Sequence, residues 1–75
     1  MAMKKRTITK HAKRRAKQRL GWKSSAIKRE FEKATMYGWY YEESNTYVYN
    51  DVVYCVANRP DRITLLTVYK SINKD

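Results

Sequence analysis

The sequence predicts an α+β fold in which two N-terminal helices pack on a four-stranded antiparallel β-meander, in the order α-α-β-β-β-β. Three observations support this prediction. Before Gly38 the chain combines strong helix formers with apolar residues at helical spacing. After Gly38 it changes to aromatic and β-branched residues, which favour strands. The connections between these later segments are short, and short connections join consecutive strands in antiparallel order.

The first helix is expected over Lys10–Leu20, a stretch without helix breakers. Thr7 or Thr9 can cap its start, because a side-chain oxygen there accepts a hydrogen bond from a free backbone N–H group. Gly21 suits the left-handed position that closes a helix. We expect residues 1–8 to form a basic N-terminal arm or a short edge segment, residues 9–70 a single α+β domain, and residues 71–75 a frayed C-terminus.

Two stripes on this helix run parallel to its axis. An apolar stripe with a spacing of four residues consists of Ile8, Ala12, Ala16 and Leu20. Its small alanines would let the helix approach a sheet closely. A second stripe at the same spacing carries His11, Arg15 and Arg19 and borders the first. Polar side chains at the border of a core can be held in a fixed geometry.

The second helix should begin at Ser24 or Ser25, either of which is a good N-cap, and end at Gly38. Its buried face is predicted from the spacing of Ile27, Phe31 and Ala34.

Four strands should follow, with turns between them. The predicted strands are Trp39–Tyr41, Thr46–Tyr49, Val52–Ala57 and Arg62–Tyr69. Asn50 and Asp51 form a two-residue connection that favours a tight hairpin. Simple alternation along the last strand would place Ile63, Leu65, Thr67 and Tyr69 on one side of the sheet, and Thr64, Leu66 and Val68 on the other. Both sides carry apolar residues, so alternation alone leaves open which side meets the helices.

The chain's 75 residues carry a net charge of +10, and the charge is unevenly spread. Residues 1–33 carry +11, whereas residues 34–75 carry −1. A basic half joined to a near-neutral half indicates a polyanionic partner, and nucleic acid is the first candidate, with RNA favoured over DNA. An anionic membrane surface is the second alternative for the basic half. A merely well-solvated basic protein is the remaining interpretation.

Other classes of protein are disfavoured by composition. The single cysteine, Cys55, cannot form an internal disulfide, and no Cys/His set has the spacing of a metal site. No apolar run approaches the roughly 20 residues that cross a bilayer, and the basic N-terminus is not followed by the apolar segment of a signal peptide. We therefore expect no cofactor, no metal, no membrane and a cytoplasmic setting.

The His11 stripe could serve RNA cleavage without a metal. In that reaction the RNA 2′-hydroxyl attacks the adjacent phosphate, so a group must take its proton and another must protonate the leaving 5′-oxygen. A histidine can do either, and two arginines can hold the phosphate. The alternative is that His11 has no role and that Arg15 and Arg19 are simply solvated.

At these residues the chain resembles a family of small bacterial and phage domains (the domain of unknown function numbered 4258). The resemblance rests on Thr9-Lys10-His11-Ala12-x-x-Arg15-x-x-x-Arg19-x-Gly21 and on the ending Leu65-Leu66-Thr67-Val68-Tyr69. Gly21 comes one residue later than the glycine of the family, and the middle of the chain is unusually rich in tyrosine. The family is similar to the barnase–EndoU–colicin–RelE group of metal-independent ribonucleases and toxins. The resemblance implies helices followed by a four-stranded antiparallel sheet, a bacterial host or a phage origin, and a catalytic site of His11, Arg15, Arg19, Thr67 and Tyr69.

Further residues are candidates for nucleic-acid contact. A phosphate-attracting surface would consist of Lys4, Lys5, Arg6, Lys13, Arg14 and Lys17. Tyr47 and Tyr49 share a strand face before an exposed turn, so one of them is a candidate for stacking on an unpaired base. Two other hypotheses stay open: a nucleic-acid-binding or phage-encoded protein without catalysis, and a protein whose basic face docks an acidic protein such as an antitoxin or a host enzyme.

Overall fold

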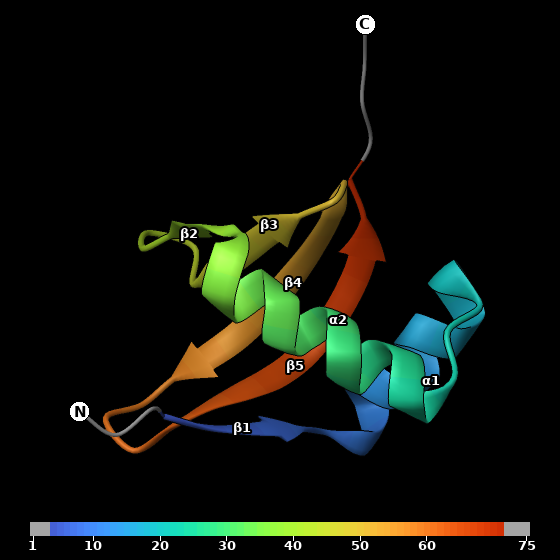
Figure 1. Cartoon of the computed structure of the whole chain (residues 1–75), viewed down its shortest axis with the longest axis horizontal. Coiled ribbons are helices and arrows are strands. Elements are labelled where there is room, and N and C mark those ends of the chain that lie inside the picture. The colour runs from blue at the N-terminus through green and yellow to red at the C-terminus, as the bar shows by residue number, and fades with distance from the viewer. Residues whose placement is uncertain (1–3, 72–75) are drawn as a thin grey trace, which may run out of the picture.

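The computed structural model describes residues 4–71 and shows two helices and a five-stranded mixed sheet (Figure 1). The elements follow one another as β1 (Lys5–Ile8), α1 (Lys10–Leu20), α2 (Ser24–Tyr37), β2 (Trp39–Tyr41), β3 (Thr46–Tyr49), β4 (Val52–Asn58) and β5 (Arg62–Lys70). The α+β class and the two helices are as predicted. Most of the frayed C-terminus predicted above, and the first three residues of the arm, lie outside the described residues.

The sheet has the order β1-β5-β4-β3-β2. Strands β2 to β5 form an antiparallel meander, as their short connections predicted. The prediction of four strands was wrong in number, because β1 adds a fifth strand that runs parallel to β5. The Thr7 and Thr64 hydroxyls meet at 2.8 Å across this pair, and the Thr9 amide donates to the Leu65 carbonyl. Residues 5–8 therefore form an edge strand.

Local capping fixes α1 at both ends. The Thr9 side chain accepts a hydrogen bond from the Ala12 amide at 3.0 Å, and its hydroxyl lies 3.1 Å from the Leu65 carbonyl. Gly21 adopts the left-handed conformation with φ 69°, and its N–H group closes the last turn on the Lys17 carbonyl. The cap at Thr9 thus also fastens the start of α1 to β5.

The predicted serine cap of α2 was wrong, because Lys23 is the N-cap and both Ser24 and Ser25 are already helical. Ile27, Phe31 and Ala34 are buried, as their spacing predicted. Gly38 ends the helix in an extended conformation, so a left-handed turn is not why glycine is required there. A Cβ at this position would lie 2.6 Å from the Ala34 carbonyl oxygen and 2.9 Å from that of Val48.

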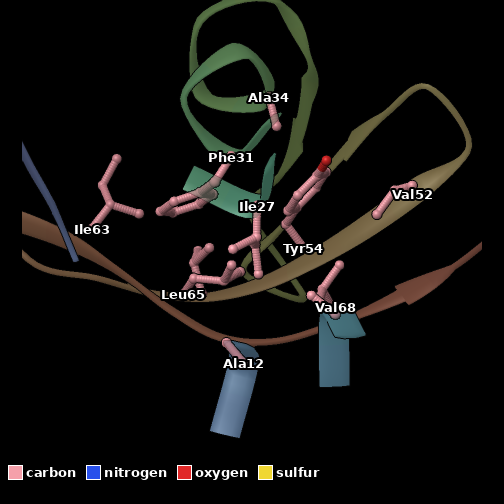
Figure 2. Packing of buried hydrophobic residues seen from close by; sticks show 11 residues of the cluster. Ala12, Ile27, Phe31, Ala34, Val52, Tyr54, Ile63, Leu65 and Val68 are labelled. Carbon is pink, nitrogen blue, oxygen red and sulfur yellow. The ribbon is translucent and has the colours of Figure 1, made fainter. Parts of the chain in front are cut away.

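The hydrophobic core lies between α2 and one face of the sheet (Figure 2). Phe31 and Tyr54 stack with ring centroids 6.1 Å apart, and Trp22 approaches Tyr54 at 6.4 Å. In Figure 2, β5 passes between α2 and α1. Ala12 and Ala16 are fully buried, so the alanine seam of α1 packs against β5 as expected. The remaining buried core residues are Val52, Val56, Ile63, Leu65 and Val68.

A β-bulge in the β4–β5 pair decides which side chains face this core. Val56 pairs with Leu65, but Cys55 pairs with Thr67, so Leu66 is an extra residue in β5. Ile63, Leu65 and Val68 are consequently buried together. The predicted simple alternation was therefore wrong beyond Leu65, and Thr67 and Tyr69 lie on the face opposite to Ile63.

Tight turns close the hairpins. Asn50 and Asp51 both have positive φ, 53° and 63°, which matches the right-handed twist of the strands they join. No helix in the described part of the chain is long and apolar enough to cross a membrane.

Candidate nucleic-acid interface

The buried alanines of α1 determine where its other side chains lie. Ala12 and Ala16 face β5, and on one flank of them Lys13 and Lys17 line shallow hollows together with residues at the start of α2, such as Ser24. His11, Arg15 and Arg19 occupy the opposite flank by helical spacing. This flank is consequently turned away from α2.

The three side chains of this flank differ in their contacts. The Arg19 guanidinium lies 3.4 Å from the Val68 carbonyl oxygen of β5. Arg15 is half-buried, and its guanidinium donates to the Gln18 side chain at 3.2 Å. His11 is exposed, and no hydrogen bond or ion pair connects its side chain to another residue within 4–71.

Thr67 and Tyr69 lie on either side of the residue whose carbonyl Arg19 contacts. Both face away from the core because of the bulge, and Tyr69 is 40% exposed. Burial raises the pKa of the Cys55 thiol, and a hydrogen bond with the Tyr69 hydroxyl partly offsets this. Of the five candidate catalytic residues, the structure brings Arg19 to the segment that carries Thr67 and Tyr69, whereas Arg15 contacts Gln18 on its own helix and His11 is exposed to solvent.

The candidate phosphate-attracting residues divide into those with a polar partner and those exposed to solvent. Arg6 has partners, since its Nε atom lies 2.6 Å from the Thr35 hydroxyl and its guanidinium 4.0 Å from the Glu32 carboxylate. Lys4 donates to the Asn58 side chain at 2.6 Å. Lys5 is exposed in β1, and the exposed cations of α1 include Lys13, Arg14 and Lys17.

Within residues 4–71, no carboxylate neutralises the cations of α1. The helix has six lysines and arginines and no acidic residue. The ion pairs in this part of the chain involve Arg6, Arg29, Lys33 and Arg62, all outside α1. The charge of α1 is therefore available to an external anion.

An open hollow of about 670 Å³ lies between β1 and the two helices. Arg6, Lys13 and Lys28 line it, together with Glu32 and residues at the start of α2. The His11 flank lies outside this hollow.

The candidate stacking tyrosines face the helix side of the sheet. Tyr47 pairs with the buried Tyr54, and Tyr47 and Tyr49 are half-buried and packed against the core. Burial and the neighbouring Tyr40 raise the pKa of Tyr47. The aromatic rings of the opposite face include Trp39 and Tyr41, which sequence reasoning did not single out. Because successive side chains of a strand point to opposite faces, the sequence already indicates that Trp39 and Tyr41 lie on the face opposite to Tyr40.

Among residues 4–71 no group of three or more His, Cys, Asp or Glu side chains is placed to hold a metal ion. No family model, no curated protein and no solved structure matches this chain.

Proposed function

We propose that this protein binds nucleic acid, with RNA favoured over DNA, through the exposed cations of α1. The observation that carries this proposal is the unneutralised charge of α1, whose alanine seam is buried while Lys13, Arg14 and Lys17 are exposed. A rigidly seated helix presents its cations at fixed spacing, and each phosphate that they neutralise releases a counterion. Affinity should therefore fall steeply as salt concentration rises.

The test compares two double variants with the same change of net charge. Arg14→Gln/Lys17→Gln removes two exposed cations of α1, whereas Arg29→Gln/Lys33→Gln removes two cations that already pair with Glu30 on α2. Binding of labelled RNA and DNA is measured by fluorescence anisotropy over a salt series. We expect the α1 variant to bind more weakly and to show a shallower dependence on salt, by about 0.7–0.9 in the logarithmic slope for each phosphate that is no longer neutralised.

The α2 variant should bind almost as the wild type does. Equal reductions of affinity in the two variants would mean that only net charge matters. No binding by the wild type to either nucleic acid at low salt would contradict the proposal.

RNA cleavage without a metal is a second candidate function. The observation that favours it is that the His11 flank and the Thr67–Tyr69 segment both face away from α2, with Arg19 at their border. In this reaction the RNA 2′-oxygen bonds to phosphorus and the bond to the 5′-oxygen breaks, which leaves a cyclic phosphate and a 5′-hydroxyl. His11 would transfer a proton, Arg15 and Arg19 would hold the phosphate, and Thr67 and Tyr69 would complete the pocket.

Cleavage is tested on varied RNAs in EDTA, with detection of the cyclic phosphate. His11→Ala should abolish the product, whereas Met36→Ala, which changes an exposed uncharged residue of α2, should retain it. The same product from wild type and His11→Ala would exclude His11 as the proton-transfer group. If no RNA yields this product, this second candidate function is excluded.

A further inference from the structure

The face of the sheet opposite α2 is largely uncovered by the helices of residues 4–71 across β2, β3 and β4, whereas α1 lies along β5. Helix α2 covers the opposite face, and in Figure 1 it crosses in front of the strands, so that the uncovered face points away from the viewer. Helix α1 continues from β1 and packs along β5. Strand register places two rows of side chains on the uncovered face. The first row across β2, β3, β4 and β5 is Trp39, Val48, Val53 and Tyr69, and the second is Tyr41, Thr46, Cys55 and Thr67.

The aromatic rings on this face are unusually open to solvent. Trp39 is 68% exposed, Tyr41 50% and Tyr69 40%. The rings of Trp39 and Tyr41 lie 6.5 Å apart at 60° to each other. Large aromatic rings are normally used to build a core, so their concentration on an uncovered face indicates a contact surface.

The charges at the border of this face indicate its occupant. Lys5 shares the face with Thr7 and Thr64, and the flank of α1 that carries Arg15 and Arg19 lies along β5. Glu42 and Glu43 belong to the β2–β3 turn at the Tyr41 end. The face is therefore bordered by positive charge on its β1–β5–α1 side, and its interior residues, Val, Thr and Cys, are uncharged.

We infer that the uncovered sheet face binds the unpaired bases of a single-stranded nucleic acid. The phosphates lie on the α1–β5 side, and the strand crosses the sheet from Tyr69 toward Trp39 and Tyr41, a span of three inter-strand steps or roughly 14 Å. Every base has an aromatic face, so stacking on these rings needs no particular sequence. Bases in a duplex stack on one another and are not free to do this.

This inference rests on the proposed nucleic-acid binding and specifies which form of nucleic acid is bound. Cations alone attract single strands and duplexes alike, whereas exposed rings add affinity only for unpaired bases. The two contributions are therefore separable by experiment.

The test measures the affinity of wild type and Trp39→Ala/Tyr41→Ala for a labelled oligouridylate and for an RNA duplex of equal length. We expect the affinity of the double variant for the single strand to fall about tenfold or more, with less than about a twofold change for the duplex. The salt dependence should stay unchanged, because no charge is removed. Tyr37→Ala is the matched control, since Tyr37 is 69% exposed but closes α2 outside this face.

A second measurement does not depend on alanine variants. Trp39→Phe keeps a ring and should retain most of the affinity. It should also strongly reduce the quenching of tryptophan fluorescence that oligouridylate causes in wild type, and any quenching that remains comes from Trp22, which lines a hollow with Lys13, Arg14 and Lys17.

Several outcomes would overturn the inference. If wild type binds with a steep salt dependence and the double variant binds the single strand as tightly as wild type does, the proposed function stands. This face is then excluded as the binding surface. Equal reductions for single strand and duplex would also exclude selective stacking. A dimeric wild type that becomes monomeric in Trp39→Ala/Tyr41→Ala, with unchanged affinity, would assign the face to a second copy of the chain. Absence of any nucleic-acid binding would overturn the proposed function itself.

Discussion

The Tyr54 hydroxyl is a buried side-chain oxygen without a hydrogen-bond partner in the described part of the protein. Its ring fills the centre of the core, stacked on Phe31, and the side chain is fully buried. A hydroxyl removed from water without a partner is unfavourable by about 1–3 kcal/mol. The ring therefore stabilises the fold while the oxygen opposes it.

Tyr54→Phe should consequently raise the free energy of unfolding by about 1 kcal/mol, measured by urea denaturation. Tyr40→Phe is the control, because the Tyr40 hydroxyl donates to the Asn45 side chain at 2.7 Å and its removal should lower stability slightly. A decrease of stability in Tyr54→Phe would show that its hydroxyl has a partner in solution.

Tyr54 should also make the free energy of unfolding depend on pH in the alkaline range. Burial, together with Glu30 and Tyr49, raises the pKa of Tyr54 above its usual value of 10.0. Above pH 10 the folded protein therefore keeps this proton, whereas the unfolded chain releases it. Because deprotonation favours the unfolded chain, the contribution of Tyr54 to the free energy of unfolding is full below pH 10 and falls as the pH rises above it. Urea midpoints measured between about pH 8 and pH 11, around the tyrosine pKa, should fall less steeply for Tyr54→Phe. Parallel curves would contradict this assignment.

Among the helices and strands, Thr9 is the junction that links three elements. It follows β1, caps α1 through the Ala12 amide and contacts the Leu65 carbonyl of β5. The position of the α1 flank relative to β5 depends on this junction. The sequence identified Thr9 as a candidate cap from its residue type, but its contact with β5 requires the strands to be in register.

Thr9→Ala should lower the free energy of unfolding by about 1–2 kcal/mol, because it removes a capping acceptor and a contact to the sheet. Thr9→Ser, which keeps the hydroxyl, should remain close to wild type. Thermal and urea unfolding followed by circular dichroism check both variants. Equal destabilisation of the two would mean that the methyl group, rather than the hydroxyl, matters.

Across the entire fold, β1 joins the start of the chain to its last strand. Lys5 pairs with Arg62 and Ile8 with Leu65, so this contact spans almost the full described chain. Strand β1 also covers an edge of β5 that would otherwise expose unpaired backbone groups. This pairing converts a four-stranded meander into a mixed sheet.

A truncated chain that starts at Thr9 should therefore be less stable and self-associate through the free edge of β5. A chain that starts at Lys5 keeps β1 and is the control. Size-exclusion chromatography with light scattering, together with urea denaturation, distinguishes them. A monomeric Thr9 truncation of unchanged stability would show that β1 contributes little.

Local sequence was sufficient to predict helix α1 with its closing glycine, Thr9 as one of two candidate caps, the buried face of α2, and the strands from Trp39 onward. Each depends on neighbouring residues, such as the spacing of Ala12 and Ala16 or the turn at Asn50–Asp51. Such preferences act over one or two helical turns or a single hairpin.

Two features came from long-range packing instead: the parallel pairing of β1, and the bulge at Leu66, which places Thr67 and Tyr69 on the same face of the sheet as Trp39. A parallel pair depends on a free strand edge more than fifty residues away, and one extra residue reverses the face of every later side chain in a strand. The charge of α1 was readable from the sequence, but the face beside it exists because α2 covers one side of the sheet and leaves the other open.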